Sequence, residues 1–265
     1  MRMANINCAR SIATDRPVGP GARVRALLGI VLLCVLTFSG HVGAAAEEAS
    51  APPAPRVNAD PAFPFSNEIA AFAKANETGP AIPDATLFLG SSSIRLWDIA
   101  GSFPDVGTIN RGFGGATTPD VLRHYARLLP RARPRAILVY VGENDLASGA
   151  TPGEVARDIL TLLKRLRADY PQARIAYLSL KPSPIRWTLW PKLAAVNMTV
   201  AARSRVSGFD YLDVGSALLA RDGLPDASLF RPDGLHMNAR GYMLWTRLVD
   251  AWLDRATDAQ GRSAS

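Results

Sequence analysis

Cysteine is scarce in this sequence: the chain has only Cys8 and Cys34, and no thiol follows residue 34. A folded domain formed by the rest of the chain therefore has no disulfide bond, no cysteine nucleophile and no cysteine-ligated metal. Its stability must come from an apolar core. The absence of these three features narrows the chemistry that the domain can perform.

Histidine is also rare, with His41, His124 and His236 as the only three. So few histidines argue against a metal site built from several imidazoles, and we expect no metal. Long apolar runs are missing as well. The longest, Ala26 to Phe38, has 13 residues and is too short to cross a bilayer comfortably.

The first 44 residues have the pattern of a secretory signal peptide. Basic residues from Arg2 to Arg25 precede the apolar run, and the small residues Val42-Gly43-Ala44 follow it. We therefore predict a signal peptide over residues 1–44, an Ala/Pro-rich linker over 45–64 and a periplasmic or secreted mature protein. Once the leader is removed, we expect no stable insertion into a membrane.

Removing the leader also changes the net charge. Residues 1–44 carry five arginines and one acidic residue, which is +4 of the formal +7 and leaves about +3 for the remainder. This small excess does not favour a nucleic-acid partner.

From residue 65 the pattern alternates between short apolar strands and amphipathic helices. We predict helices over 66–76, 118–129, 152–166, 191–206 and 239–255, capped by Ser66, Thr118, Thr151 and Asn238 where a cap is identifiable. The predicted strands cover 86–90, 106–110, 136–141, 175–180 and 211–214. This alternation indicates a parallel sheet with helices on both faces, in one domain over 65–257 that is followed by a disordered tail over 258–265.

Three polar groups follow successive strands of this sheet, where ligands of such folds bind. Ser92 comes after the first strand, Gly115 after the second and Asn144 after the third. A serine in a strand-to-helix turn can be a nucleophile, and a backbone N–H or an amide can bind an oxyanion. Each of the three also has a plain structural alternative, as a helix cap or a tight turn.

The second half of a serine hydrolase site is present near the C-terminal end of the domain. His236 lies in a turn before the last helix, and Asp233 precedes it by three residues, so one loop can carry a base and the carboxylate that orients it. His124 lies inside a predicted helix, and we interpret it as a surface or packing residue. The alternatives for Asp233 and His236 are a helix entry or half of a metal site. The metal site is disfavoured because no other histidine is near in the pattern and cysteine is absent after residue 34.

Taken together, these segments resemble the SGNH (GDSL-like) hydrolases, with the bacterial lysophospholipase-like members as the nearest group. Ser92, Gly115, Asn144 and the Asp233/His236 pair match the family's four blocks. The resemblance implies a three-layer α/β/α sandwich with a flavodoxin-like strand order 2-1-3-4-5. It also implies ester hydrolysis without a cofactor, by a Ser-His-Asp triad and an oxyanion hole formed by Ser92, Gly115 and Asn144. Two departures, Ser91 and Ala116 where the family often has acidic residues, weaken any substrate assignment.

The predicted function is that of an exported serine esterase acting on a small-molecule, glycan or lipid ester. Two alternatives stay open from the sequence alone. The same site could transfer an acyl group to envelope polysaccharide, or the fold could serve as a non-catalytic binding domain. Trp187 and Trp190 follow the fourth strand, where they either wall the pocket or cover the edge of the core. We favour the latter role.

Overall fold

The computed structural model describes residues 65–263. The predicted signal peptide and linker, together with the last two residues of the chain, lie outside the described residues. Within the described range, no helix is both long enough and apolar enough to cross a membrane.

A single sheet of five parallel strands forms the centre of the domain, in the order β2-β1-β3-β4-β5. This order and the helices on both faces confirm the predicted three-layer α/β/α fold. The strands are β1 (Thr86–Gly90), β2 (Thr108–Gly112), β3 (Ala136–Tyr140), β4 (Arg174–Leu178) and β5 (Asp210–Leu212).

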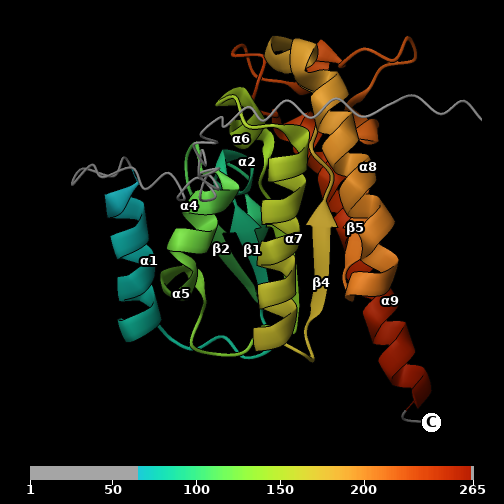
Figure 1. Cartoon of the computed structure of the whole chain (residues 1–265). Coiled ribbons are helices and arrows are strands. Elements are labelled where there is room, and N and C mark those ends of the chain that lie inside the picture. The colour runs from blue at the N-terminus through green and yellow to red at the C-terminus, as the bar shows by residue number, and fades with distance from the viewer. Residues whose placement is uncertain (1–64, 264–265) are drawn as a thin grey trace, which may run out of the picture. The chain divides into compact units, whose positions relative to one another are not determined.

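The helices of the described residues connect these strands and cover the sheet. In Figure 1, α4, α5 and α7 lie in front of the sheet and α9 runs behind it. The α-helices are α1 (Ser66–Thr78), α2 (Ser92–Arg95), α3 (Ile99–Ser102), α4 (Thr118–Arg123), α5 (Tyr125–Leu128), α6 (Glu143–Ala147), α7 (Pro152–Asp169), α8 (Trp190–Ser207) and α9 (Ala239–Ser263). Three short 3₁₀ helices complete the set: η1 (Pro184–Leu189), η2 (Ser216–Leu218) and η3 (Ala227–Leu229).

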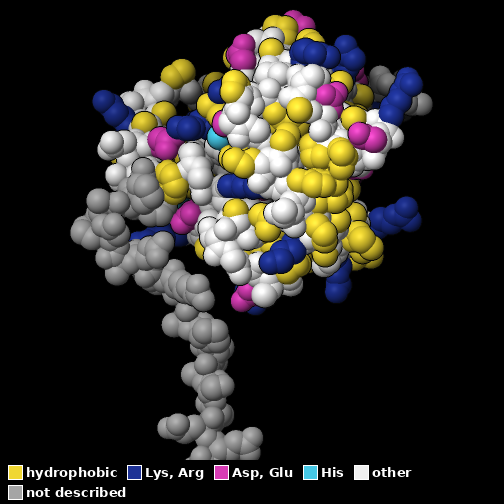
Figure 2. Space-filling view, turned by 90° about the horizontal axis from the view of Figure 1, so that it is seen from above, with side chains coloured by type: hydrophobic (Ala, Val, Ile, Leu, Met, Phe, Trp, Pro, Cys, Tyr) yellow, Lys and Arg dark blue, Asp and Glu magenta, His cyan; other side chains and the backbone are white. Residues whose placement is uncertain are grey.

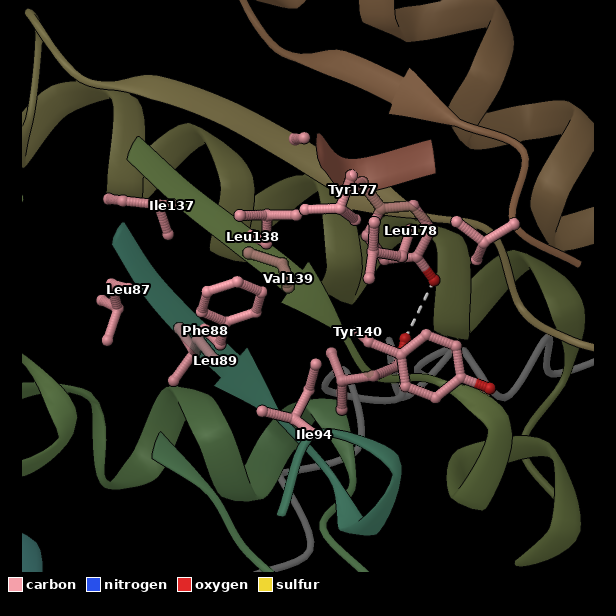
Figure 3. Close-up of a cluster of buried hydrophobic side chains, with 14 of the residues drawn as sticks. Leu87, Phe88, Leu89, Ile94, Ile137, Leu138, Val139, Tyr140, Tyr177 and Leu178 are labelled. Atoms are coloured by element: carbon pink, nitrogen blue, oxygen red, sulfur yellow. Dashed lines mark hydrogen bonds between the residues drawn. The ribbon is translucent and has the colours of Figure 1, made fainter. Parts of the chain in front are cut away.

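The central strands β1 and β3 are almost entirely apolar because helices cover both of their faces. Every residue of β1 and β3 is buried. Figure 3 shows side chains of these strands, such as Leu87 and Val139, packed in the interior together with Tyr177 of β4. The Tyr177 hydroxyl is satisfied within this core, because it donates a 2.9 Å hydrogen bond to the carbonyl of Val141.

Several predicted element boundaries were wrong by one or more residues. The second strand begins at Thr108, not Val106, because the N–H of Val106 closes a turn onto the Phe103 carbonyl at 3.1 Å. Ser66 is the first residue of α1 and not its cap, since Phe65 occupies that position.

The predicted helix over 118–129 is also different in the structure. Thr117, not Thr118, caps it through a reciprocal capping box with Asp120. The helix then breaks at His124, whose non-helical backbone separates α4 from α5.

The last helix is longer than predicted. It ends at Ser263, well past the boundary near Arg255, and extends into the segment predicted as a disordered tail. Its inward face carries Trp245 and Val249, which are buried, whereas Leu248 is 38% exposed. The helical phase that buries Trp245 and Trp252 places Leu248 beside solvent.

Candidate active site

The turn after β1 holds three serines in different environments. Gly90 has a φ of +152°, and a β-carbon at this position would collide with the carbonyl oxygen of Tyr140, so the turn requires glycine. Ser91 donates its backbone N–H to that carbonyl at 3.0 Å. Ser91 and Ser93 are each 3% exposed, whereas Ser92 is partly exposed. Among the three, Ser92 is therefore the serine that an external ester can reach.

Contacts from distant elements hold this turn in place. The hydroxyl of Tyr242 on α9 donates a 2.9 Å hydrogen bond to the carbonyl of Ser93. On the other side, Asn110 of β2 donates from its amide to the Ile94 carbonyl at 2.9 Å. The short helix α2 is thus fixed from both neighbouring elements, and it needs little stability of its own.

Asp233 and His236 share one loop between η3 and α9. The Asp233 carboxylate accepts hydrogen bonds from the backbone N–H groups of Leu235 and His236, both at 2.9 Å. Its other oxygen lies 2.7 Å from Nδ1 of the His236 ring. Desolvation raises the pKa of Asp233, but the hydrogen bonds from His236 and Leu235 outweigh it and lower the pKa to about 2. The carboxylate is therefore ionised at neutral pH and fixes the orientation of the imidazole.

The other ring nitrogen of His236 contacts the serine turn. Nε2 of His236 lies 3.0 Å from Oγ of Ser92, although 144 residues separate the two in the sequence. The structure therefore places the side chains of Ser92, His236 and Asp233 in one chain of contacts of 3.0 Å or less. With Nδ1 held as the donor to Asp233, Nε2 of a neutral ring is free to accept the proton of the serine hydroxyl.

Gly115, in the loop after β2, and Asn144, on α6, belong to segments that meet beside this turn. Gly115 has a φ of +70° in the loop after β2, and that loop is joined to the serine turn by a 3.1 Å hydrogen bond from Phe113 N–H to the Gly90 carbonyl. The Asn144 amide donates to the carbonyl of Ala116, next to Gly115, at 3.0 Å. An amide has two N–H donors, so Asn144 keeps one more for a ligand.

A buried ionic cluster next to Asn144 was missed by the sequence reasoning. Glu143 is 5% exposed and accepts hydrogen bonds from Lys181 (2.8 Å), Arg186 (3.1 Å) and the Tyr140 hydroxyl (2.7 Å). Burial raises the pKa of Glu143, but the charges of Lys181 and Arg186 and the hydrogen bonds to Lys181 and Tyr140 outweigh it, so the net pKa is lowered. A signal did exist in the sequence, because Glu143 and Lys181 closely follow the apolar segments of two strands.

A second buried carboxylate supports the glycine loop. Asp145 accepts the backbone N–H of Thr118 at 2.9 and 3.1 Å. Burial raises its pKa to about 6, because the hydrogen bonds from Thr118 only partly offset desolvation. Two neighbouring side chains of α6 thus bind the loop after β2: Asn144 binds the carbonyl of Ala116, and Asp145 binds the N–H of Thr118.

The remaining sequence candidates lie outside this constellation. His124 is at the junction of α4 and α5, where desolvation and the nearby Arg123 and Arg127 lower its pKa. Trp187 and Trp190 stack on each other with ring centroids 5.8 Å apart. Trp190 packs against the core, as the preferred interpretation had it.

The site is an open one. The side chain of Asp233 is 46% exposed and that of His236 is 22% exposed. In the view from above the sheet, Lys and Arg side chains are scattered across this face and do not form one continuous patch (Figure 2). Within residues 65–263, no group of three or more His, Cys, Asp or Glu side chains is arranged to hold a metal ion.

A hollow of about 800 Å³ lies elsewhere, lined by residues around Arg174, Asp210 and Trp252. None of the site residues lines it. The contacts between Ser92, His236 and Asp233 are a stronger indication of chemistry than the size of a hollow.

Comparison with known proteins points to one family. Residues 95–244 match the sequence model of the GDSL-like Lipase/Acylhydrolase family. This range includes Gly115, Asn144, Asp233 and His236 and begins three residues after Ser92. The chicken (Gallus gallus) protein named platelet-activating factor acetylhydrolase IB subunit alpha2 is 31% identical over 172 residues, which cover 60% of this chain and 71% of that protein.

Solved structures share the fold at low sequence identity. A protein from Streptococcus pneumoniae described as a putative platelet activating factor is 19% identical, with a TM-score of 0.65 over 71% of this chain and 91% of that one. A GDSL-like lipase from Bacteroides thetaiotaomicron is 17% identical, with a TM-score of 0.61 over 71% and 98% of the two chains. The sequence model spans more than half of the chain, and the chain therefore belongs to the GDSL-like lipase/acylhydrolase family, which hydrolyses ester bonds.

Proposed function

We propose that this protein is an exported serine esterase that cleaves carboxylic esters through an acyl-enzyme intermediate. The observation that carries the proposal is the position of the His236 ring, with Nε2 3.0 Å from Ser92 Oγ and Nδ1 2.7 Å from Asp233. Nucleophile, base and orienting carboxylate lie within hydrogen-bonding distance of one another, which is the arrangement that serine hydrolysis requires.

In the first half of the reaction, Ser92 Oγ attacks the carbonyl carbon of the ester and His236 Nε2 takes the hydroxyl proton. The oxyanion that forms accepts hydrogen bonds from the backbone N–H groups of Ser92 and Gly115 and from the second N–H of Asn144. The intermediate collapses when His236 gives its proton to the departing alkoxide. The alcohol leaves, and the acyl group stays on Ser92.

In the second half, water attacks the acyl carbonyl and His236 takes one of its protons. Collapse of this second intermediate releases the carboxylic acid, and Ser92 Oγ recovers its proton from His236. Asp233 stays ionised throughout and stabilises the imidazolium that forms at each step. No cofactor takes part in this scheme.

We further propose that the acyl group is short. The exposure of Asp233 and His236 supports an open site, which suits a small acyl group on a larger alcohol. The chicken relative, named as an acetylhydrolase, supports the same choice. Hydrolysis of p-nitrophenyl acetate should therefore exceed hydrolysis of the decanoate in kcat/KM. The reverse order would contradict the short-chain assignment.

The serine assignment is tested with a fluorophosphonate probe and three matched alanine variants. Ser92→Ala should abolish both labelling and turnover of p-nitrophenyl acetate. Ser91→Ala and Ser93→Ala should still be labelled and should lose no more than about tenfold in rate, the scale of one hydrogen bond. Labelling that persists in Ser92→Ala would overturn the assignment.

Export is proposed from the basic and apolar pattern of residues 1–44. Mass spectrometry of the protein isolated from cells should find an N-terminus near Ala44 or Ala46. A mature protein that retains Cys34 would contradict the proposal.

A further inference from the structure

The ionic cluster beside Asn144 includes a contact that bears on catalysis. One nitrogen of the Arg186 guanidinium, Nη1, donates to Oε1 of Glu143 at 3.1 Å and to Oδ1 of Asn144 at 3.0 Å. Arg186 therefore joins the buried carboxylate directly to the amide that the proposed mechanism uses. Its side chain is 21% exposed, and Glu143 is 5% exposed.

This contact determines which way the Asn144 amide faces. A guanidinium can only donate hydrogen bonds and a backbone carbonyl can only accept them. Arg186 must therefore meet the amide oxygen, and the Ala116 carbonyl, 3.0 Å away, must meet the amide nitrogen. A 180° rotation of the amide would set donor against donor and acceptor against acceptor. The two contacts together hold Asn144 in a single orientation, with its NH₂ group beside the glycine loop.

Arg186 is itself held in place by the cluster. Glu143 is ionised and shared with Lys181, which is 1% exposed and lies 2.8 Å from its other oxygen. The three side chains carry a net charge of +1 next to the amide. This charge favours the negative oxygen that develops during ester cleavage.

The same segment also contacts the histidine loop. Ile185, the neighbour of Arg186 in η1, donates its backbone N–H to the carbonyl of Gly234 at 3.1 Å. Gly234 lies between Asp233 and His236. Adjacent residues of η1 thus support the oxyanion donor through a side chain and the base through the backbone.

We propose that Arg186 is a positioning residue, which orients Asn144 for the oxyanion and is itself fixed by Glu143 and Lys181. The inference rests on the proposed function, because it assigns a role to Arg186 only if Asn144 binds the oxyanion. An amide that stabilises the transition state acts on kcat more than on KM. Loss of Arg186 should have the same kinetic signature, in a weaker form.

The test is a double-mutant cycle on the full chain with p-nitrophenyl acetate. Asn144→Ala should lower kcat by about 10²–10³-fold, as for other oxyanion donors. Arg186→Met keeps an unbranched apolar stem and removes the guanidinium with its hydrogen-bond donors. It should lower kcat by about 10- to 100-fold with KM within about twofold, because the amide is misplaced and not lost. In the Asn144→Ala background, Arg186→Met should change kcat by less than about threefold.

Arg167→Met is the matched control. Arg167, near the C-terminal end of α7, donates to the carbonyls of Tyr170, Pro171, Ala173 and Gly208. It lines the hollow around Arg174, Asp210 and Trp252, which contains none of the site residues. We expect this variant to lower the thermal midpoint while kcat stays near wild type. Arg186→Met should be compared at a temperature where both variants are folded by circular dichroism.

The outcomes separate the inference from the proposed function. If Arg186→Met leaves kcat unchanged, or lowers it equally with and without Asn144, Arg186 does not act through the amide and the inference fails. If Asn144→Ala itself has no effect on kcat, the oxyanion assignment fails and the inference fails with it. A fall in kcat that depends on Asn144 supports both.

Discussion

Replacing Lys181 by Met tests how the domain tolerates charge in its interior. Lys181 is 1% exposed and Glu143 5%, and their charged atoms lie 2.8 Å apart. Methionine retains most of the apolar stem and removes only the ammonium group. Glu143 would then keep Arg186 and the Tyr140 hydroxyl as partners.

The expected loss of unfolding free energy follows from the removal of one of the charged partners of Glu143. Breaking a buried ion pair by removing one partner costs about 3–5 kcal/mol of unfolding free energy. Because Arg186 and Tyr140 remain, we expect the lower end of this range, about 3 kcal/mol. With an m-value of about 2 kcal/mol/M, the urea midpoint should fall by about 1.5 M.

Equilibrium urea unfolding at pH 7, followed by circular dichroism, measures this change. Lys164→Met, at an exposed position of α7, is the control and should stay within about 0.5 kcal/mol of wild type. In the double variant Lys181→Met/Glu143→Gln, the loss should be at least about 1 kcal/mol smaller than the sum of the single losses. A loss below about 1 kcal/mol for Lys181→Met alone would refute the reasoning.

The pH dependence gives an independent check. The folded-state pKa of Glu143 is lowered, so this carboxylate contributes stability above its unfolded value of 4.5, and the contribution is lost as the pH falls below it. Lys181→Met removes part of the cause of that lowering. The difference in unfolding free energy between wild type and variant should therefore shrink as the pH falls below about 4.5.

Three further predictions concern the site and its supports. His236→Ala should lower kcat at least about 10³-fold in the p-nitrophenyl acetate assay, whereas His124→Ala should stay near wild type; equal losses would contradict the choice of base. Asp233→Asn should lower kcat by about 10³–10⁴-fold, because the imidazole then adopts the wrong tautomer; a mild effect would exclude that role. Asp145 has a pKa raised to about 6 from 3.8, so its contribution to stability is present below 3.8 and lost as the pH rises through 6. As the pH rises from 4 to 6.5, the unfolding free energy of the wild type, measured with urea, should therefore fall by on the order of 2 kcal/mol relative to that of Asp145→Asn. If the unfolding free energies of the two proteins changed in parallel with pH, this prediction would be refuted.

The parts of the molecule that local patterns specify were predicted well from sequence. The buried strand β3 reads directly from its apolar run, and Thr151 was predicted as the cap of α7, which the structure confirms. Asp233 and His236 were chosen as a candidate pair because both lie in one turn, and their side chains are 2.7 Å apart in the structure. In each case the information sits within a few neighbouring residues.

The errors arise where a distant residue decides the local structure. Thr117 and Thr118 are equally good caps by type, and the choice between them is linked to the bond from Thr118 N–H to Asp145, 27 residues away. The contact of Arg186 with Asn144 spans 42 residues. No short pattern encodes such pairs, because they depend on how the loops at the strand ends pack together.

The long separation between Ser92 and His236 also has a consequence for synthesis. A chain made from its N-terminus produces all five strands of the sheet before Asp233 and His236, since β5 ends at Leu212. Domains tend to fold in this vectorial order. During elongation, the serine turn therefore exists for a time without its base and without Tyr242, which binds the turn from α9. A growing chain that already displays Ser92 therefore lacks the base that the proposed mechanism requires, until the segment with Asp233 and His236 has been made and docked.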